Sequence, residues 1–334
     1  MTTISKVAER AGVSRTTVSH VLNHAERVSP HLRERVIAAI AELGYVPNPQ
    51  AQSLRTGRTN MVAVLIPDIR NPFYPELVKT VQSDLEAAGR DTLIFNTDVP
   101  GGHSQQLGRD YLRHIRNRRV DGLIVGDFAL FGLHDALLDI DIPTVFIGKL
   151  PNGAVDNVWV DDESACHAMG RYVAGRGHRR VAQITGPAYF PEAMARARGF
   201  RDGLLSGGVT PENILDYEGS FLGPSGTDGV NFLLDTQGQN LPSALFFGNH
   251  LMAQGGLPAL FDRGLSIPKD MAVAVYGDQP QMDYLRPRLT RIGVPPATQA
   301  HRAVQMLIDR LSGSYTGPPR SERLEGVFKE YDSM

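Results

Sequence analysis

The feature that most constrains the fold is an alternation of apolar runs and helical stretches that continues from Asn60 to the C-terminus. Stretches such as 75–88, 164–176 and 297–311 carry apolar residues at helical spacing between the runs. This alternation predicts α/β units in which helices cover both faces of parallel sheets. So many strands indicate two doubly wound lobes, with a ligand crevice at the carboxyl ends of the strands. The predicted strands are 61–66, 92–95, 122–125, 144–147, 158–160, 181–184, 244–247, 272–276 and 289–292.

The N-terminal segment follows a different pattern, that of short amphipathic helices. Thr3 precedes the first helix, Gly12 ends it, and Ser14 begins the second. The second helix turns Val18 and Val21 inward, and its outward residues are all hydrogen-bonding types. A plain three-helix bundle has no need for such a face. The pattern therefore predicts an all-α helix-turn-helix domain that reads DNA.

The outward side chains of the second helix are the candidate DNA contacts. Arg15, Thr16 and His20 are predicted to touch base edges, and arginine suits guanine O6 and N7. A second set of short polar side chains is predicted to hold phosphates and set the register on the duplex. This set is Thr3, Ser14, Thr17, Ser19 and Asn23.

Charge and cysteine content narrow the class of protein. Residues 1–60 contain 8 Lys or Arg against 4 Asp or Glu, whereas the rest of the chain contains 26 against 32. A basic head on an acidic body predicts that only the head meets a polyanion, although so small an excess can also arise by chance. Cys166 is the single cysteine, which excludes an intramolecular disulfide and favours a reducing compartment. With no signal-peptide pattern and no apolar run of about 20 residues, we expect a soluble, cytoplasmic protein.

The sequence lacks the patterns that would indicate an enzyme. It contains no G-x-S-x-G, H-E-x-x-H, P-loop or G-x-G-x-x-G motif. The triplet Asp161-Asp162-Glu163 could suggest a cation site. Its place between a strand and a helix favours an N-cap followed by acidic first-turn residues. We therefore expect no catalytic residue, cofactor or metal.

The segment TISKVAERAGVSRTTVSHVLN, followed by VSPHLRERVIAAIAELGYVPNPQAQSLRTGRT, resembles the head of the lactose/galactose repressor family. The resemblance continues through nearly the whole chain. It implies a ligand-responsive repressor that binds a pseudo-palindromic operator of roughly 14–20 base pairs as a homodimer. It also implies a body like that of periplasmic sugar-binding proteins. The implied domains are a helix-turn-helix at 1–46, a hinge at 47–58 and an effector-binding and dimerisation domain at 59–334. The chain is expected to cross between the two lobes of the last domain near residues 157, 286 and 315. Lobe 1 is then 59–156 and 287–314, and lobe 2 is 157–286 and 315–334.

The hinge segment has two interpretations from its pattern alone. Asn48 and Pro49 can begin a short helix, or the segment is an ordinary linker. In the family, the hinge helices of two subunits pair in the minor groove and a leucine from each wedges between base pairs. Leu54 matches that leucine, and Arg55 is expected to contact phosphate. Gln52 stands where many relatives carry Arg, which puts part of the backbone contacts in doubt.

The resemblance also assigns an effector site in the cleft between the lobes. Phe73 and Tyr74 match aromatics that line the cleft, although lobe packing is an equally good interpretation of each. Arg196 matches the arginine that contacts the effector, with Arg198 nearby as the alternative. Phe221 matches an aromatic that stacks on the effector. The whole predicted set is Phe73, Tyr74, Lys149, Phe190, Arg196, Phe221, Asn249 and Asp278.

Departures from the family pattern bear on the effector. His250 stands where relatives usually carry Asp, and Gly277 takes the place of an Asp that binds sugar hydroxyls, leaving only Asp278 beside it. Lys149 lies where many relatives have Asp. The missing carboxylates and the additional positive charge of Lys149 near Arg196 predict that the effector is an anion, such as a sugar phosphate or an organic acid. Two alternatives remain: either the cleft binds no ligand, or the chain is a solute-binding protein that does not bind DNA. The intact helix-turn-helix pattern of the head argues against the second.

Overall fold

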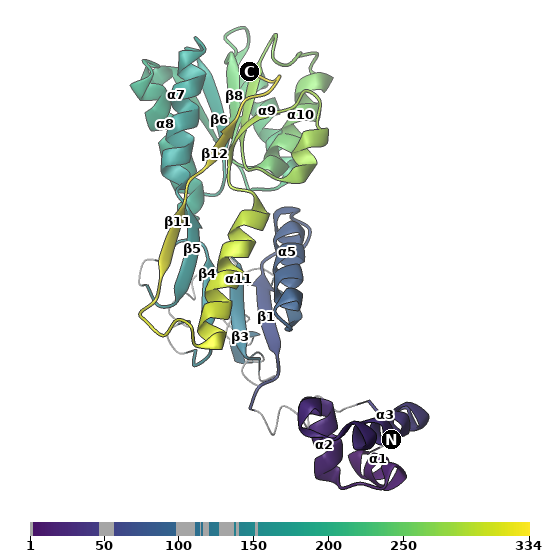
Figure 1. Cartoon of the computed structure of the whole chain (residues 1–334). Coiled ribbons are helices and arrows are strands. Elements are labelled where there is room, and N and C mark those ends of the chain that lie inside the picture. Colours follow the sequence, from purple (N-terminus) through teal and green to yellow (C-terminus); the bar gives the residue numbers. More distant parts are fainter. Residues whose placement is uncertain are drawn as a thin grey trace. The chain divides into compact units, whose positions relative to one another are not determined.

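The computed structural model describes residues 3–46, 57–97, 111–113, 115, 120–126, 137, 140–150 and 153–334. Its contacts divide the chain between Thr59 and Asn60 into a small N-terminal unit, the head, and a large unit, the body. Figure 1 draws the elements of both units. Most of the predicted hinge, including Leu54 and Arg55, lies outside the described residues.

The described part of the head is helical, as predicted. Val7, Val18 and Val36 are fully buried and hold the three α-helices together. Gly12 ends the first helix with a left-handed φ of 63°, and the guanidinium of Arg35 lies against it, 2.6 Å from the place a Cβ would take. The left-handed φ is what favours glycine at this position. The elements are α1 Ile4–Ala11, α2 Arg15–Asn23, η1 Ala25–Arg27 and α3 Pro30–Leu43.

The body contains two sheets, one in each lobe. The first has the order β11-β5-β4-β3-β1-β2 and all its pairs are parallel. The second has the order β12-β10-β9-β8-β6-β7 and is parallel except for β12. The α/β class with two doubly wound lobes is thus confirmed. The strands are β1 Met61–Ile66, β2 Asp91–Asn96, β3 Gly122–Gly126, β4 Thr144–Ile147, β5 Asp156–Val160, β6 Val181–Thr185, β7 Ile214–Glu218, β8 Ala244–Phe247, β9 Ala272–Tyr276, β10 Thr290–Gly293, β11 Ser321–Leu324 and β12 Val327–Lys329.

Helices cover the sheets and close the apolar cores. In the first lobe α5 and α11 pack beside β1 and β3, and in the second lobe α7 and α8 lie on one side of the sheet and α9 and α10 on the other (Figure 1). No helix in the described part of the chain is long and apolar enough to cross a membrane. The helices are α5 Phe73–Ala87, α7 Asp162–Gly175, α8 Pro191–Ser206, η3 Pro211–Asn213, α9 Gly223–Gln237, α10 His250–Asp262, η4 Pro280–Tyr284 and α11 Pro296–Ser312.

The chain crosses between the lobes at different places from those predicted. The first crossing follows Val160 rather than residue 157, because the whole of β5 pairs with β4 and β11 in the first sheet. The second follows Gly293 rather than residue 286, because β10 pairs with β9 in the second sheet. The third lies between β11 and β12, at residues 325–326 rather than near 315. The predicted lobe limits of 156/157, 286/287 and 314/315 were therefore wrong.

Close packing of α8 against α7 fixes the helix that carries Arg196. A Cβ on Gly199 would lie 2.2 Å from the carbonyl oxygen of Glu163, and one on Gly203 would lie 2.2 Å from that of His167. The two backbones can approach so closely only because these residues are glycine. Cys166 lies in the same contact on α7, fully buried among apolar side chains.

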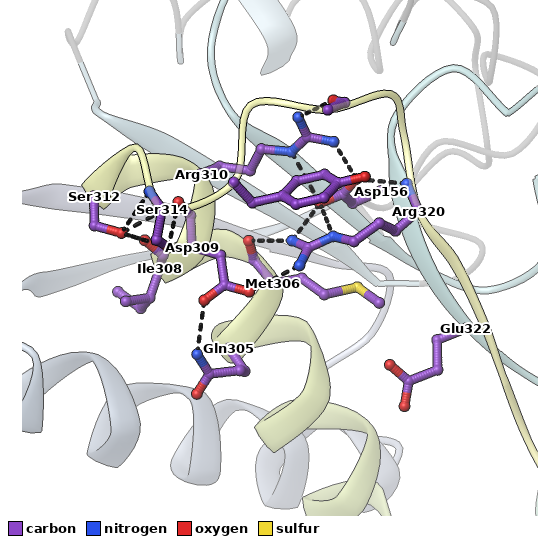
Figure 2. A network of polar contacts seen from close by, with 12 residues as sticks. Asp156, Gln305, Met306, Ile308, Asp309, Arg310, Ser312, Ser314, Arg320 and Glu322 are labelled. Carbon is purple, nitrogen blue, oxygen red and sulfur yellow. Dashed lines mark hydrogen bonds and ion pairs between the residues drawn. The ribbon is translucent and has the colours of Figure 1, made fainter.

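A network of polar side chains ties the segment between α11 and β11 to the first lobe (Figure 2). Asp156, the first residue of β5, has no exposed side-chain surface and pairs with Arg310 and Arg320 at 2.7 Å each. Arg320 also donates to Asp309, and Tyr315 lies under both guanidinium groups. Burial alone would raise the pKa of Asp156, but the hydrogen bonds from the two arginines outweigh it and hold the pKa below its ordinary value of 3.8.

Candidate functional site

The exposed side of α2 carries the side chains predicted to read bases. Arg15, Thr16 and His20 are exposed, whereas Val18 and Val21 are buried against the other helices. A helix with exposed hydrogen-bonding side chains has the dimensions and chemistry of an element that enters a major groove. We call Arg15, Thr16 and His20 the reading face.

Two of the side chains predicted to hold phosphates, Thr3 and Ser14, cap helices. Thr3 accepts a hydrogen bond from the backbone N–H of Lys6 at the start of α1, and Ser14 accepts one from that of Thr17 at the start of α2. Neither helix has an acidic residue in its first turn, so the positive end of each helix dipole remains available to an anion. At the other end of α2, the amide of Asn23 donates to the carbonyl of Ser19 at 2.7 Å.

The body contains a cavity of about 920 Å³ lined by residues from both lobes. The first lobe contributes residues at the ends of β1, β4 and β5, and the second lobe contributes residues at the ends of β7, β8 and β9. These are the carboxyl ends of parallel strands, where the α/β pattern predicts a ligand. The size is that of small-molecule sites. We call this space the cavity.

Aromatic side chains form much of the cavity wall. The rings of Phe73 and Tyr74 meet edge to face with centroids 5.1 Å apart, and those of Phe190 and Phe221 are tilted with centroids 6.0 Å apart. Flat apolar faces of this kind suit a ring-shaped ligand. The aromatic residues of the wall are Phe73, Tyr74, Trp159, Tyr189, Phe190, Phe221 and Tyr276.

Phe221 is held in an unusual backbone conformation. Its φ is 65°, a left-handed value that non-glycine residues adopt rarely and at some energetic cost. The amide of Asn249 donates to its carbonyl at 2.8 Å, and the other end of that amide accepts a hydrogen bond from the N–H of Met252 at 2.9 Å. The ring lies against Gly186, where a Cβ would be 2.1 Å from it. The predicted stacking residue is therefore fixed in place, and Asn249 is occupied in fixing it.

Arg196 lies across the inner wall of the cavity on α8. Its guanidinium stacks 3.8 Å from the ring centroid of Tyr276, and Nη1 donates to the carbonyl of Gly248 at 3.2 Å. Nε is 3.4 Å from a carboxylate oxygen of Asp162, which also accepts a hydrogen bond from the hydroxyl of Tyr276. The arginine predicted to contact the effector is thus oriented by three groups and neutralised by one of them.

Most charges around the cavity are already paired. Four carboxylates of the wall each have an arginine partner within 3.4 Å, in the pairs Asp68–Arg70, Asp161–Arg323, Asp162–Arg196 and Glu163–Arg198. Lys149 instead lies 4.6 Å from the ring centroid of Trp159. Burial raises the pKa of the remaining carboxyl, Glu192, above its ordinary value. The wall therefore has little net charge to offer an ion.

Three buried polar atoms of the wall have no hydrogen-bond partner in the described part of the chain. The first is Nε of Arg196, whose contact with Asp162 at 3.4 Å is an ion pair without a hydrogen bond. The others are Nε2 of His250, whose residue is 3% exposed, and Oε1 of Gln279, whose residue is 5% exposed. Burial, and to a smaller extent the charge of Arg196, lower the pKa of His250 to about 4, so its ring is neutral at pH 7. Buried polar groups in proteins nearly always have partners, so these three atoms have hydrogen-bonding capacity that the described residues leave unused.

The structure brings together all but one of the predicted effector residues. The exception is Asp278, which does not line the cavity. Its carboxylate is buried in ion pairs with Arg291 and Lys329, both at 2.7 Å. The side chain was placed wrongly because its partners lie on β10 and β12, beyond the reach of local pattern. The residues in the wall are Phe73, Tyr74, Lys149, Phe190, Arg196, Phe221 and Asn249.

The acidic triplet after β5 behaves as predicted, with one addition. Asp161 caps α7 by accepting a hydrogen bond from the N–H of Ser164 at 3.1 Å, and Asp162 and Glu163 follow in the first turn. Asp162 has a second role in orienting Arg196 that the prediction missed.

Several other wall residues were not predicted, among them Trp159, Tyr189, Tyr276, His250 and Gln279. A usable signal was present, because four of these residues lie within three positions of the end of a predicted strand.

Comparison with known proteins agrees with both parts of this architecture. Residues 3–48 match the bacterial regulatory proteins of the lacI family, and residues 171–328 match the periplasmic binding protein-like domain. The ribose operon repressor of Escherichia coli (strain K12) is 33% identical over 318 residues, which cover 93% of this chain and 94% of that protein.

Two solved structures extend the likeness. The transcriptional regulator CelR in complex with cellobiose is 28% identical, with a TM-score of 0.71 and complete coverage of both chains. The lac repressor dimer bound to operator and an anti-inducer has a TM-score of 0.87 at 24% identity, over 99% of this chain and 98% of that one, and supports the fold. The prediction of a transcription regulator rather than an enzyme is confirmed, and the chain belongs to the lacI family of bacterial regulatory proteins.

Proposed function

We propose that two copies of this chain grip a pseudo-palindromic operator, with each reading face in a major groove. Arg15, Thr16 and His20 contact base edges, and the capped starts of α1 and α2 meet phosphates. The dimer bound to operator in the lac repressor structure supports this arrangement. The observation that carries the proposal is that one chain holds both the reading face and a cavity with unpartnered polar atoms. We propose that operator binding takes place in the cytoplasm, where bacterial operators are.

The effector in this proposal is a neutral, hydroxylated ring. Aromatic faces suit the face of such a ring, and the polar wall is nearly uncharged because Arg196 is paired with Asp162. The anion predicted from Lys149 and Arg196 has less support, since Arg196 has no charge to spare and Glu192 lies in the same wall. The ribose operon repressor and the CelR–cellobiose complex make ribose and cellobiose the first ligands to test.

Ligand control follows from the position of the cavity. A ligand that touches both lobes favours one angle between them, and the three crossings must adjust together. Such a shift changes operator affinity only if the two lobe arrangements differ in their affinity for the ligand.

Operator binding is tested by selecting tight binders from a pool of random 20-base-pair duplexes. The full chain should enrich one pseudo-palindrome, and Arg15→Ala should weaken binding to it by about 1–3 kcal/mol and relax one base position. Arg27→Ala is the matched control, because it removes an exposed arginine of the head that is not on α2. Equal, salt-sensitive binding to every duplex would contradict the proposal.

Leu54, outside the described residues, is proposed as the wedge that kinks the operator at its centre. Leu54→Ala should reduce the bend angle of the selected operator in a gel-phasing assay, because an apolar wedge is what unstacks the base step. Arg55→Ala should weaken binding through a lost phosphate contact and leave the bend in place. An unchanged bend in Leu54→Ala would exclude the wedge.

Effector control is tested with the same operator. D-ribose and cellobiose are titrated into the protein–operator complex while fluorescence anisotropy reports the bound fraction, and ribose 5-phosphate serves as the anionic contrast. A neutral sugar should change operator affinity and the phosphate should not. If operator affinity changed with ribose 5-phosphate alone, the hypothesis of an anionic effector would be favoured instead.

A further inference from the structure

The side chain of His250 has no role in the fold that would explain its place. It is the first residue of α10, but Asn249 caps that helix, so the imidazole is not needed there. The residue is 3% exposed, and Nε2 is buried without a hydrogen-bond partner in the described chain. The residue belongs to the cavity wall. A buried nitrogen left in this state costs folding free energy, which a bound group would recover.

The neighbouring Arg196 has the complementary shortage. Nη1 donates to Gly248, whereas Nε, 3.4 Å from Asp162, is buried without a hydrogen-bond partner in the described part of the chain. A guanidinium has five N–H donors and no acceptor, whereas a neutral imidazole has one donor and one acceptor. The wall thus offers a spare donor on Arg196 and, when the neutral ring is protonated at Nδ1, a spare acceptor at Nε2 of His250.

A hydroxyl group satisfies both requirements at once. Its oxygen accepts from a guanidinium N–H while its proton is donated to an imidazole nitrogen. A carboxylate or a fully ionised phosphate accepts from Arg196 but has no proton to donate to an unprotonated Nε2 of His250, and a deoxy position does neither. We propose that His250 is a specificity-determining residue that selects a ligand hydroxyl, held between Arg196 and His250, over an anionic group.

This inference rests on the proposed function of the cavity. It adds a residue and a chemical rule to it, because the N–H donors of Arg196 alone can bind an anionic or a neutral oxygen. With a neutral acceptor beside it, the same arginine favours a neutral, proton-bearing oxygen. Gln279, whose Oε1 is also buried and unpartnered, offers a second acceptor in the same wall.

The test uses calorimetry on the full chain with D-ribose, cellobiose and ribose 5-phosphate. His250→Leu removes the acceptor at similar size, and His250→Gln retains one. His167→Leu, a histidine of α7 outside the wall, is the matched control. His250→Leu should weaken the tighter neutral sugar by about 3- to 10-fold and leave ribose 5-phosphate unchanged. His250→Gln and His167→Leu should bind like the wild type.

Monodeoxy analogues of the same sugar separate a contact from a structural effect. For D-ribose these are the 2-, 3- and 5-deoxy compounds, and for cellobiose the corresponding monodeoxy series. One analogue should bind more weakly than the parent sugar to the wild type, and that difference should vanish in His250→Leu. Equal losses in both proteins, or full affinity in His250→Leu, overturn the inference and leave the proposed function standing. Failure of the wild type to bind either neutral sugar overturns the neutral-ring proposal and this inference with it.

Discussion

The two ends of strand β5 hold buried polar clusters of opposite character. At its first residue, Asp156 receives hydrogen bonds from Arg310 and Arg320, and the other groups of the network are satisfied in turn (Figure 2). At its other end, Trp159 and Val160 border the cavity, whose wall includes Nε2 of His250 and Oε1 of Gln279, neither of which has a hydrogen-bond partner among the residues that the structure describes. One cluster is complete within the chain, and the other is not.

This difference separates stability from function. A saturated network in a low-dielectric interior holds elements together, and here it fixes the segment between α11 and β11 to the first lobe. An unsaturated cluster does the reverse, because each unpartnered group lowers the stability of the empty protein. Mutations at the two ends of β5 should therefore change the free energy of unfolding by different amounts and even in opposite directions.

The largest effect is expected for Asp156→Asn. Removing the charge leaves the partly buried Arg310 without a counter-ion and Arg320 with Asp309 alone, which should lower the free energy of unfolding by about 3–5 kcal/mol. Urea denaturation at pH 7 measures it. Asp235→Asn, which breaks the pair with Arg263 at a carboxylate that is 64% exposed, should cost about 0–1 kcal/mol. If the two variants lost similar amounts of stability, the network around Asp156 would contribute no more than an exposed ion pair.

Acid should remove part of the same stabilisation. The pKa of Asp156 in the folded chain is below its ordinary value of 3.8, so its contribution is complete above that pH and is lost as pH falls through the folded pKa. The difference in unfolding free energy between wild type and Asp156→Asn should stay constant from pH 7 to pH 5 and narrow below 3.8. A difference that already narrows above pH 5 would mean that the pKa is not lowered.

Tyr276→Phe tests Asp162, a buried carboxylate at the cavity end of β5. The Tyr276 hydroxyl donates to Asp162, and hydrogen bonds to charged groups contribute about 1.5–3 kcal/mol, so the variant should be destabilised by that amount. Tyr284→Phe, on an exposed ring, should leave stability unchanged. Thermal denaturation of both variants gives the comparison, and a stable Tyr276→Phe would show that Asp162 does not depend on this bond.

The smallest effect, and the one with the opposite sign, is expected for His250→Leu. Without ligand, exchange of an unpartnered imidazole for an apolar side chain should leave stability unchanged or raise it by up to about 1 kcal/mol. Urea denaturation of the ligand-free protein measures this. A loss of stability comparable with that of Tyr276→Phe would reveal a structural role for the ring.

The sequence pattern predicted the interior strands because burial on both faces makes them continuously apolar. The run Ala272–Tyr276 is buried at every position. Strands β7, β11 and β12 lie at sheet edges, and their exposed residues break the apolar run, so pattern alone missed them. The lobe crossings were misplaced for a related reason, since only the pairing of β5 and β10 decides which sheet each joins.

Residues of the candidate site could be predicted where the type of side chain alone indicates its role. Phe221 and Arg196 were found because an aromatic face and a fixed guanidinium are recognisable by residue type. Asp278 was misassigned because a carboxylate binds a ligand or an arginine equally well, and its partner Arg291 is near only in the fold. His250 was noted as a departure, but its unpartnered nitrogen is a property of the packed wall.

The burial of Cys166 has a practical consequence for following lobe motion. Burial raises the pKa of this only thiol well above its ordinary value, so it will not react readily with maleimides. A single surface cysteine introduced into each lobe could therefore carry a fluorophore without background labelling. The distance between the two dyes would report directly on whether a sugar closes the lobes.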